Sequence, residues 1–150
     1  EGKPPPPEPL ANIRVDLPIP VSLPEEYVAD TWLRLKMYRR LAELDSMEEI
    51  EEMEKELVDR FGPLPEPAGN LMYQLRLKAL ARDAGVGIVA QDNGRLALHS
   101  AGKEYPREEL RRVLDGRASI SRFGIWLPKE AGWETMLVDV LKTMASVTGG

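Results

Sequence analysis

The sequence contains no cysteine and only one histidine, His99, among its 150 residues. The lack of cysteine excludes disulfide bonds and thiolate metal ligands, and it fits the reducing cytoplasm, where we expect the protein to act. A single histidine excludes metal sites built on several imidazoles and leaves only His99 itself for histidine-based catalysis. Because His99 ends an alternating apolar stretch, we interpret it as an ordinary strand-end residue, with a ligand or acid–base role as the alternative.

Motifs that bind nucleotides, metals or membranes are also missing. Gly85-Val86-Gly87 lacks the third glycine of a dinucleotide-binding loop, and no Gly-Lys-Ser/Thr sequence occurs. The acidic stretch 48–56 lacks the Asp/Asn-Gly turn of a calcium-binding loop, so a solvated face explains it better than a metal site. No apolar run approaches the roughly 20 residues of a membrane-spanning helix. We therefore predict no catalytic residues, no cofactor, no metal and no membrane contact for this chain.

The composition is that of one globular domain. Hydrophobic residues make up 43% of the chain and charged residues 30%, and the net charge of −5 argues against general affinity for nucleic acid. The chain begins without methionine in a proline-rich stretch that includes Pro4 to Pro7, so we expect a segment of a longer protein. We assign residues 1–10 to a proline-rich linker, 11–147 to a single domain that is a monomer in isolation, and 148–150 to a flexible tail.

Amphipathic helices are predicted in the first half of the chain, over residues 31–44, 46–60 and 66–84. Asp30 is the expected N-cap of the first helix, and Trp32 and Tyr38 are expected to widen its buried stripe. Ser46 and Glu49 have the spacing of a capping box and fix the start of the second helix. Apolar residues on two arcs of the third helix predict that it is covered on two sides.

Beyond Gly85 the sequence changes to the two-residue period of strands. Asp92-Asn93-Gly94 between two alternating stretches is the strongest hairpin signal in the chain. Further elements are expected as strands over 12–17, 118–122 and 125–127 and as helices over 106–114 and 132–145. The predicted fold class is therefore α+β, with an N-terminal half of three helices followed by a small antiparallel sheet with flanking helices.

Two charged surfaces are candidates for binding. Acidic residues spaced along one side of the second helix, without nearby basic residues to offset them, form either a solvated face or a docking face, namely Glu49, Glu52, Glu56 and Asp59. Basic residues around the short helix 106–114 form either a salt-bridged surface or a nucleic-acid contact, namely Arg107, Arg111, Arg112 and Arg117, with Lys103 and Arg122 nearby. Interleaved glutamates dilute the second cluster and favour the salt-bridged interpretation.

The stretch 56–65 joins two helices through a helix end, a stop and a rigid turn. Phe61 continues the apolar face, Gly62 can take the left-handed conformation that ends a helix, and Pro63 prevents the helix from resuming. With its neighbours, this stretch resembles the C-terminal domain of the bacterial transcription-repair-coupling factors. The resemblance covers about residues 13–88 and rests on LPEEYV at 23–28, RLKMYRRLA at 34–42, ELVDRFGPLP at 56–65, NL at 70–71 and LKALA at 77–81.

The resemblance implies a non-catalytic regulatory domain of a larger ATP-dependent DNA translocase, which removes stalled RNA polymerase and recruits nucleotide excision repair. In that family the domain packs on the protein's own UvrB-like N-terminal module and hides the surface for UvrA until polymerase engagement releases it. The family's acidic contact positions match Glu56 and Asp59, so we expect an interface of Glu52, Glu56 and Asp59. UvrA and RNA polymerase are then indirect partners, and direct contact with nucleic acid is not expected. The alternative is a DNA- or polymerase-contacting module that uses Arg107, Arg111, Arg112 and Arg117.

Overall fold

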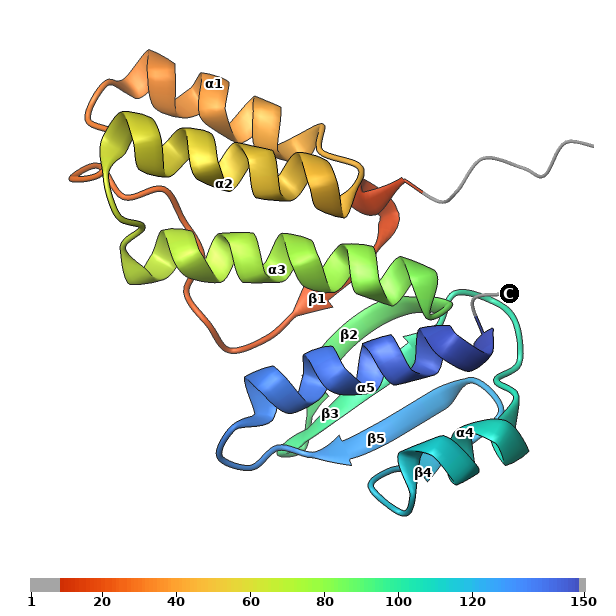
Figure 1. The fold of residues 1–150 in the computed structure, drawn as a ribbon. Helices are drawn as coiled ribbons and strands as arrows, with labels where there is room; N and C mark the ends of the chain where they lie inside the picture. Colours follow the sequence, from red (N-terminus) through yellow and green to blue (C-terminus); the bar gives the residue numbers. More distant parts are fainter. Residues whose placement is uncertain (1–8, 149–150) are drawn as a thin grey trace, which may run out of the picture.

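The structure, a computed structural model, describes residues 9–148 of the chain. Its elements in chain order are η1 (Leu10–Asn12), β1 (Arg14–Asp16), α1 (Thr31–Ala42), α2 (Met47–Phe61), α3 (Glu66–Asp83), β2 (Val86–Asp92), β3 (Arg95–Ser100), α4 (Arg107–Leu114), β4 (Ser119–Ile120), β5 (Gly124–Pro128) and α5 (Trp133–Thr148). A helical layer formed by α1, α2 and α3 adjoins a sheet covered by α5, with α3 between the two parts (Figure 1). The predicted α+β class is confirmed.

The helical core lies among α1, α2 and α3. It is centred on Met37, Leu57 and Met72, one from each helix, all of which are fully buried. The start of α1 is fixed by Asp30, whose carboxylate accepts a hydrogen bond from the backbone N–H of Leu33 at 2.9 Å. Such an N-cap contributes about 1 kcal/mol, and it fixes the residue at which α1 begins.

The expectation that Trp32 and Tyr38 widen the buried stripe of α1 is wrong. Met37 and Leu41 occupy the core side of the helix, and Trp32 is rotated away from them by the helical period, leaving it 81% exposed. Tyr38 is 36% exposed, and its hydroxyl accepts a hydrogen bond from the backbone N–H of Leu23 at 2.6 Å. Tyr38 therefore holds the incoming loop, while Trp32 has no role in either hydrophobic core.

The end of α2 is held by a side chain from the preceding loop. The hydroxyl of Tyr27 lies 3.1 Å from the carbonyl oxygen of Leu57 and 2.7 Å from that of Gly62, within reach of both. Its ring packs against Phe61, with ring centroids 5.7 Å apart. Gly62 has a φ of 95°, a conformation that favours glycine and turns the chain toward α3. The helix stop predicted at this position is confirmed.

Helix α3 is covered on two sides, as predicted. Met72 and Leu75 belong to the helical core, whereas Leu77 and Ala81 belong to the sheet core, which α3, α4 and α5 form with the sheet. From α5, Leu137 is one of several fully buried residues in the sheet core. The two cores therefore share a helix, so that a change in α3 affects both.

The sheet has five strands in the order β1-β2-β3-β5-β4. The predicted hairpin joins β2 and β3, with positive φ at Asn93 and Gly94 as a two-residue hairpin turn requires. The sheet is mixed and not wholly antiparallel, because β1 pairs in parallel with β2 through Val15 opposite Val89. A parallel pair needs a long crossover connection, and here the three helices of the helical layer form that connection.

The domain boundaries differ from the predicted ones at both ends. Leu10 was assigned to the linker but is 2% exposed within the helical core, so the folded domain begins before residue 11. Thr148 ends α5 and has its hydroxyl 3.1 Å from the carbonyl oxygen of Ala84. Residues 1–8 of the predicted linker, with its prolines 4–7, and the last two tail residues lie outside the described residues. None of the helices within residues 9–148 is long and apolar enough to cross a membrane.

Candidate protein-docking surface

Helix α2 carries the acidic residues predicted to form the interface, and its first turn explains one of them. The Ser46 hydroxyl accepts a hydrogen bond from the backbone N–H of Glu49 at 3.1 Å. The Glu49 carboxylate in turn accepts one from the backbone N–H of Asp45 at 2.7 Å, one residue earlier than in the usual capping box. Glu49 is therefore engaged in starting the helix.

Glu56 lies on the side of α2 that faces α1, where Arg40 holds it. Both guanidinium Nη atoms contact the carboxylate, with Arg40 Nη2 2.6 Å from Glu56 Oε1. Arg60, one turn further along α2, contributes a second contact at 3.2 Å. The hydrogen bond from Arg40 is the main reason that the pKa of Glu56 falls to about 2, and Arg60 acts in the same direction. The expectation that the acidic residues lack nearby basic partners is therefore wrong for Glu56.

Glu52 and Asp59 lie on the outer side of α2. They agree with the expectation that the acidic residues lack nearby basic partners. Both side chains are exposed, and neither forms an ion pair within residues 9–148. They are seven residues apart, two turns along the same side of the helix. Of the three residues predicted to form the interface, Glu52 and Asp59 thus have no ion pair within residues 9–148, and Glu56 lies beside them in an existing pair.

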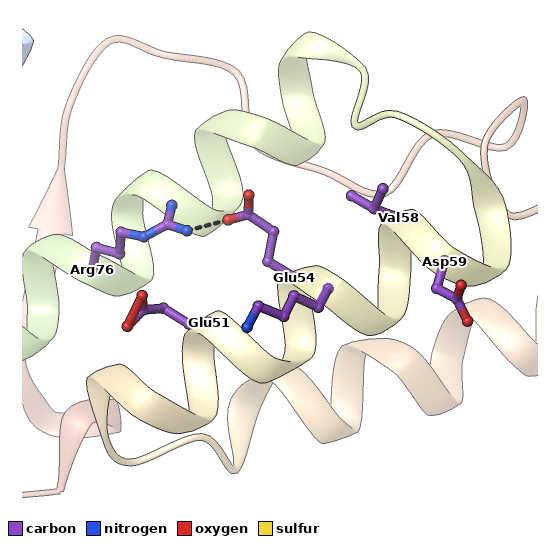
Figure 2. A pocket seen from close by; sticks show the side chains of 6 residues that line it. Glu51, Glu54, Val58, Asp59 and Arg76 are labelled. Atoms are coloured by element: carbon purple, nitrogen blue, oxygen red, sulfur yellow. Dashed lines mark hydrogen bonds and ion pairs between the residues drawn. The ribbon is translucent and has the colours of Figure 1, made fainter.

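Two shallow hollows flank the acidic side of α2. One, of about 290 Å³, lies toward α1 and includes Glu52 and Glu56 among its lining residues. The other, of about 420 Å³, lies toward α3 and includes Asp59. Figure 2 shows the second hollow, with Glu54 and Arg76 paired between α2 and α3 and Asp59 further along α2, pointing away from that pair. Each hollow therefore includes an exposed carboxylate that forms no ion pair within residues 9–148, Glu52 in the first and Asp59 in the second.

The basic cluster lies at the opposite end of the molecule from α1 and α2 (Figure 1). Within residues 9–148 its only ion pair is that of Arg122 with Glu104, at 2.8 Å, and Arg117 donates from Nε to the backbone carbonyl of Leu114. The salt-bridged interpretation therefore holds for Arg122 alone. Besides Arg117, three exposed arginines form no ion pair in the described part of the chain, namely Arg107, Arg111 and Arg112.

His99 lies near the end of β3, half-buried. Its ring meets the Trp126 ring edge-on, with centroids 6.2 Å apart. Among the described residues, no group of three or more histidine, cysteine, aspartate or glutamate side chains is placed to hold a metal ion. Packing against a neighbouring strand accounts for the position of His99.

Sequence reasoning missed Arg40 as the partner of Glu56. The two residues are 16 positions apart and meet only because α1 and α2 pack side by side. A signal was available, since short loops favour antiparallel neighbours and the exposed side of the first predicted helix is basic. The fold and this surface define a small α+β domain whose distinctive chemistry lies in its charged helices.

Comparison with known proteins places this domain in a family. The model of the TRCF domain matches residues 17–109, and the chain belongs to that family. The chain is 45% identical over 75 residues to the transcription-repair-coupling factor of Mycobacterium bovis, covering 50% of this chain and 6% of that protein. It is 40% identical over 72 residues to the transcription-repair-coupling factor of Escherichia coli, covering 48% of this chain and 6% of that protein. The chain thus corresponds to a small part of each of these relatives.

A solved structure gives the likeness over nearly the whole chain. The crystal structure of the C-terminal domain of a transcription-repair coupling factor superposes with a TM-score of 0.78. It covers 91% of this chain and 94% of that one at 18% sequence identity, so the likeness concerns the fold. The resemblance that the sequence motifs indicated is confirmed.

Proposed function

We propose that this chain is the C-terminal regulatory domain of a transcription-repair-coupling factor and that it docks through α2 on the protein's own UvrB-like N-terminal module. In the resting state the docked domain masks the surface that binds UvrA, and engagement of RNA polymerase releases it. The larger protein is an ATP-dependent DNA translocase that acts in the cytoplasm, and this domain regulates it without catalysing a reaction. The observation that supports the proposal is that the carboxylates of Glu52 and Asp59 on α2 are exposed and form no ion pair within residues 9–148.

The three interface residues contribute differently in this proposal. Glu52 and Asp59 form direct ion pairs with arginines of the N-terminal module. Glu56 contributes through the Arg40 contact, which fixes the spacing of α1 and α2 and brings a positive charge next to the acidic side. Ion pairs at an exposed interface contribute about 0.2–1 kcal/mol each. Coupling free energies of about 1–3 kcal/mol are enough for a switch, so a few such pairs can hold the domain and still release it.

Docking is tested by adding this chain in trans to the separately produced N-terminal module. Wild type is compared with Glu52→Arg/Asp59→Arg by calorimetry at two salt concentrations. We expect the double variant to weaken binding at least tenfold and the wild-type affinity to fall as salt rises. The matched control, Glu108→Arg/Glu109→Arg, makes the same charge change on α4 and is expected to bind like wild type. Equal binding by all three proteins would remove α2 from the interface.

The basic cluster supports a second candidate function, a DNA- or polymerase-contacting surface. The observation in its favour is that Arg107, Arg111 and Arg112 are exposed and form no ion pair within residues 9–148. If this surface binds DNA, affinity for a duplex oligonucleotide falls steeply with salt, and Arg107→Ala/Arg111→Ala reduces that slope. Absence of binding at low salt removes the DNA form of this candidate, and absence of binding to purified polymerase removes the other.

A further inference from the structure

The outer side of α1 carries four exposed residues that contribute to neither hydrophobic core, namely Trp32, Leu35, Lys36 and Arg39. They occupy positions i, i+3, i+4 and i+7, so they form one continuous stripe, here called the α1 stripe. Trp32 is 81% exposed and Leu35 is 46% exposed. A single exposed apolar residue is ordinary. An exposed tryptophan and leucine one turn apart on a rigid helix form a raised apolar surface with a defined shape.

The two other arginines of α1 have partners on the flanks of the helix. Arg34 donates to the backbone carbonyl of Val28 at 2.8 Å, and Arg40 pairs with Glu56. Lys36 and Arg39 differ from them, because neither forms an ion pair within residues 9–148. The α1 stripe is thus not used in holding the helix to the rest of the domain.

The charge of the α1 stripe selects the sign of its partner. Helix α1 contains four basic residues and no acidic residue, in a chain whose net charge is −5. A partner that covers Lys36 and Arg39 must supply negative charge, and a partner that covers Trp32 and Leu35 must supply apolar side chains. An amphipathic helix with apolar residues on one side and flanking carboxylates has both properties. Tryptophan and arginine are also the residue types most enriched among energetically dominant interface residues.

We propose that the α1 stripe is a docking site for an acidic amphipathic helix of a partner protein. This site differs from the α2 surface in the sign of its charge, since α2 offers carboxylates and α1 offers cations. The two surfaces therefore take different partners or different segments of one partner, and the proposal for α1 does not depend on the proposed function. Trp32 is the anchor that the partner buries, Leu35 extends the apolar contact, and Lys36 and Arg39 set orientation and salt dependence.

The test uses the 150-residue chain and two synthetic peptides of 18 residues. The first peptide is a helix with leucine on one side flanked by glutamate, and the second has lysine in place of every glutamate. Binding is measured by fluorescence anisotropy of a dye on the peptide. We expect saturable binding of the glutamate peptide, and at least tenfold weaker binding of the lysine peptide. Trp32→Ala is expected to weaken binding of the glutamate peptide at least tenfold, which corresponds to about 1.4 kcal/mol.

A matched control distinguishes a specific anchor residue from non-specific apolar binding. Phe123 is 46% exposed on the turn between β4 and β5, so Phe123→Ala removes an exposed aromatic ring elsewhere and is expected to leave peptide binding unchanged. Lys36→Glu/Arg39→Glu is expected to reverse the preference between the two peptides. Circular dichroism checks that each variant is folded, which is expected because all three side chains on α1 are exposed.

Three results overturn the proposal. One is the absence of saturable binding of the glutamate peptide by folded wild type. Another is equal weakening by Trp32→Ala and Phe123→Ala, which would indicate non-specific apolar contact. The third is Trp32-dependent binding of a single-stranded oligonucleotide or of anionic phospholipid vesicles, while the glutamate peptide does not bind. That result would assign the α1 stripe to a different class of ligand.

Discussion

The helical half and the sheet half of this chain are held together in different ways. Within residues 9–148, four of the five ion pairs lie in the helical half, namely Arg40–Glu56, Arg60–Glu56, Arg76–Glu54 and Arg82–Asp45. Both halves have an apolar core, but among the described residues the sheet half has only the Arg122–Glu104 pair and is held in addition by backbone ladders between its strands. Exposed ion pairs contribute little to stability and exchange readily. The helical half can therefore change its contacts at the surface while the fold persists, which is what a reversible docking surface requires.

Among the substitutions considered, one in α3, the helix shared by the two halves, should have the largest effect on the free energy of unfolding. Leu77→Ala removes a fully buried side chain that α3 contributes to the sheet core. We expect the free energy of unfolding to fall by about 2–5 kcal/mol, the range for a leucine that leaves a cavity. Because α3 also belongs to the helical core, urea unfolding of the variant should remain a single transition by circular dichroism and by tryptophan fluorescence. Two separated transitions would mean that the halves are independent.

Substitution of either of two comparable tyrosines, one in each half, should have the next largest effect on the free energy of unfolding. Tyr27 hydrogen-bonds at the end of α2, and Tyr105 hydrogen-bonds to the backbone carbonyl of Leu98 in the sheet half. Replacing either by phenylalanine should lower the free energy of unfolding by about 0.5–1.5 kcal/mol per hydrogen bond lost. Only Tyr27→Phe should also weaken binding in trans to the N-terminal module, because it loosens α2. If Tyr105→Phe weakens that binding equally, the helical half has no special role in docking.

The contribution of the Arg40–Glu56 ion pair to stability should depend on pH, which provides a further test of how the helical half is held together. The pKa of Glu56 is about 2 in the folded protein against an ordinary 4.5, chiefly because of the hydrogen bond from Arg40. A lowered folded pKa stabilises the fold fully above the ordinary value, and this stabilisation is lost as the pH falls through the folded value. We expect Glu56→Gln to be less stable than wild type by about 0.2–1 kcal/mol at neutral pH, since the pair is partly exposed. The difference should shrink below about pH 4.5 and vanish near pH 2 in urea titrations.

The smallest expected effect on stability belongs to the outer side of α2. Glu52 and Asp59 have no ion pair to lose within residues 9–148. Glu52→Arg/Asp59→Arg should therefore change the free energy of unfolding by no more than about 0.5 kcal/mol, as is usual for surface substitutions. Thermal unfolding measures this. A loss of several kcal/mol would show that these carboxylates support the fold and would undermine their assignment to an interface.

Local signals in the sequence predicted most of the fold. Asp30 and Ser46 mark helix starts, Gly62 marks a helix end and Asn93-Gly94 marks a hairpin, and each acts through its own neighbours, so no tertiary information is needed. The parallel pairing of β1 with β2 was not predictable in the same way, because it depends on how a long helical connection folds back. The exposure of Trp32 follows from its position in the helical period relative to Met37 and Leu41, whereas hydrophobicity alone favours its burial.

The candidate site was predictable as a set of residues but not as an arrangement. The spacing of the acidic residues placed them on one helix. The structure shows that their side chains point to different surroundings. Glu49 begins the helix, Glu56 pairs with Arg40, and Glu52 and Asp59 face outward. Ion pairs between helices depend on tertiary packing, so the local sequence around Glu56 does not reveal Arg40. Whether Glu52, Glu56 and Asp59 form an interface stays a prediction.

The most direct test of the proposed masking mechanism is UvrA binding by the full-length protein in the absence of RNA polymerase. Wild type is compared with protein carrying Glu52→Arg/Asp59→Arg in this domain, and with Glu108→Arg/Glu109→Arg as the control. We predict that wild type and control bind UvrA weakly, and that the α2 variant binds it as tightly as protein from which this domain has been deleted. Weak binding by the α2 variant, together with tight binding by the deleted protein, would contradict masking through α2.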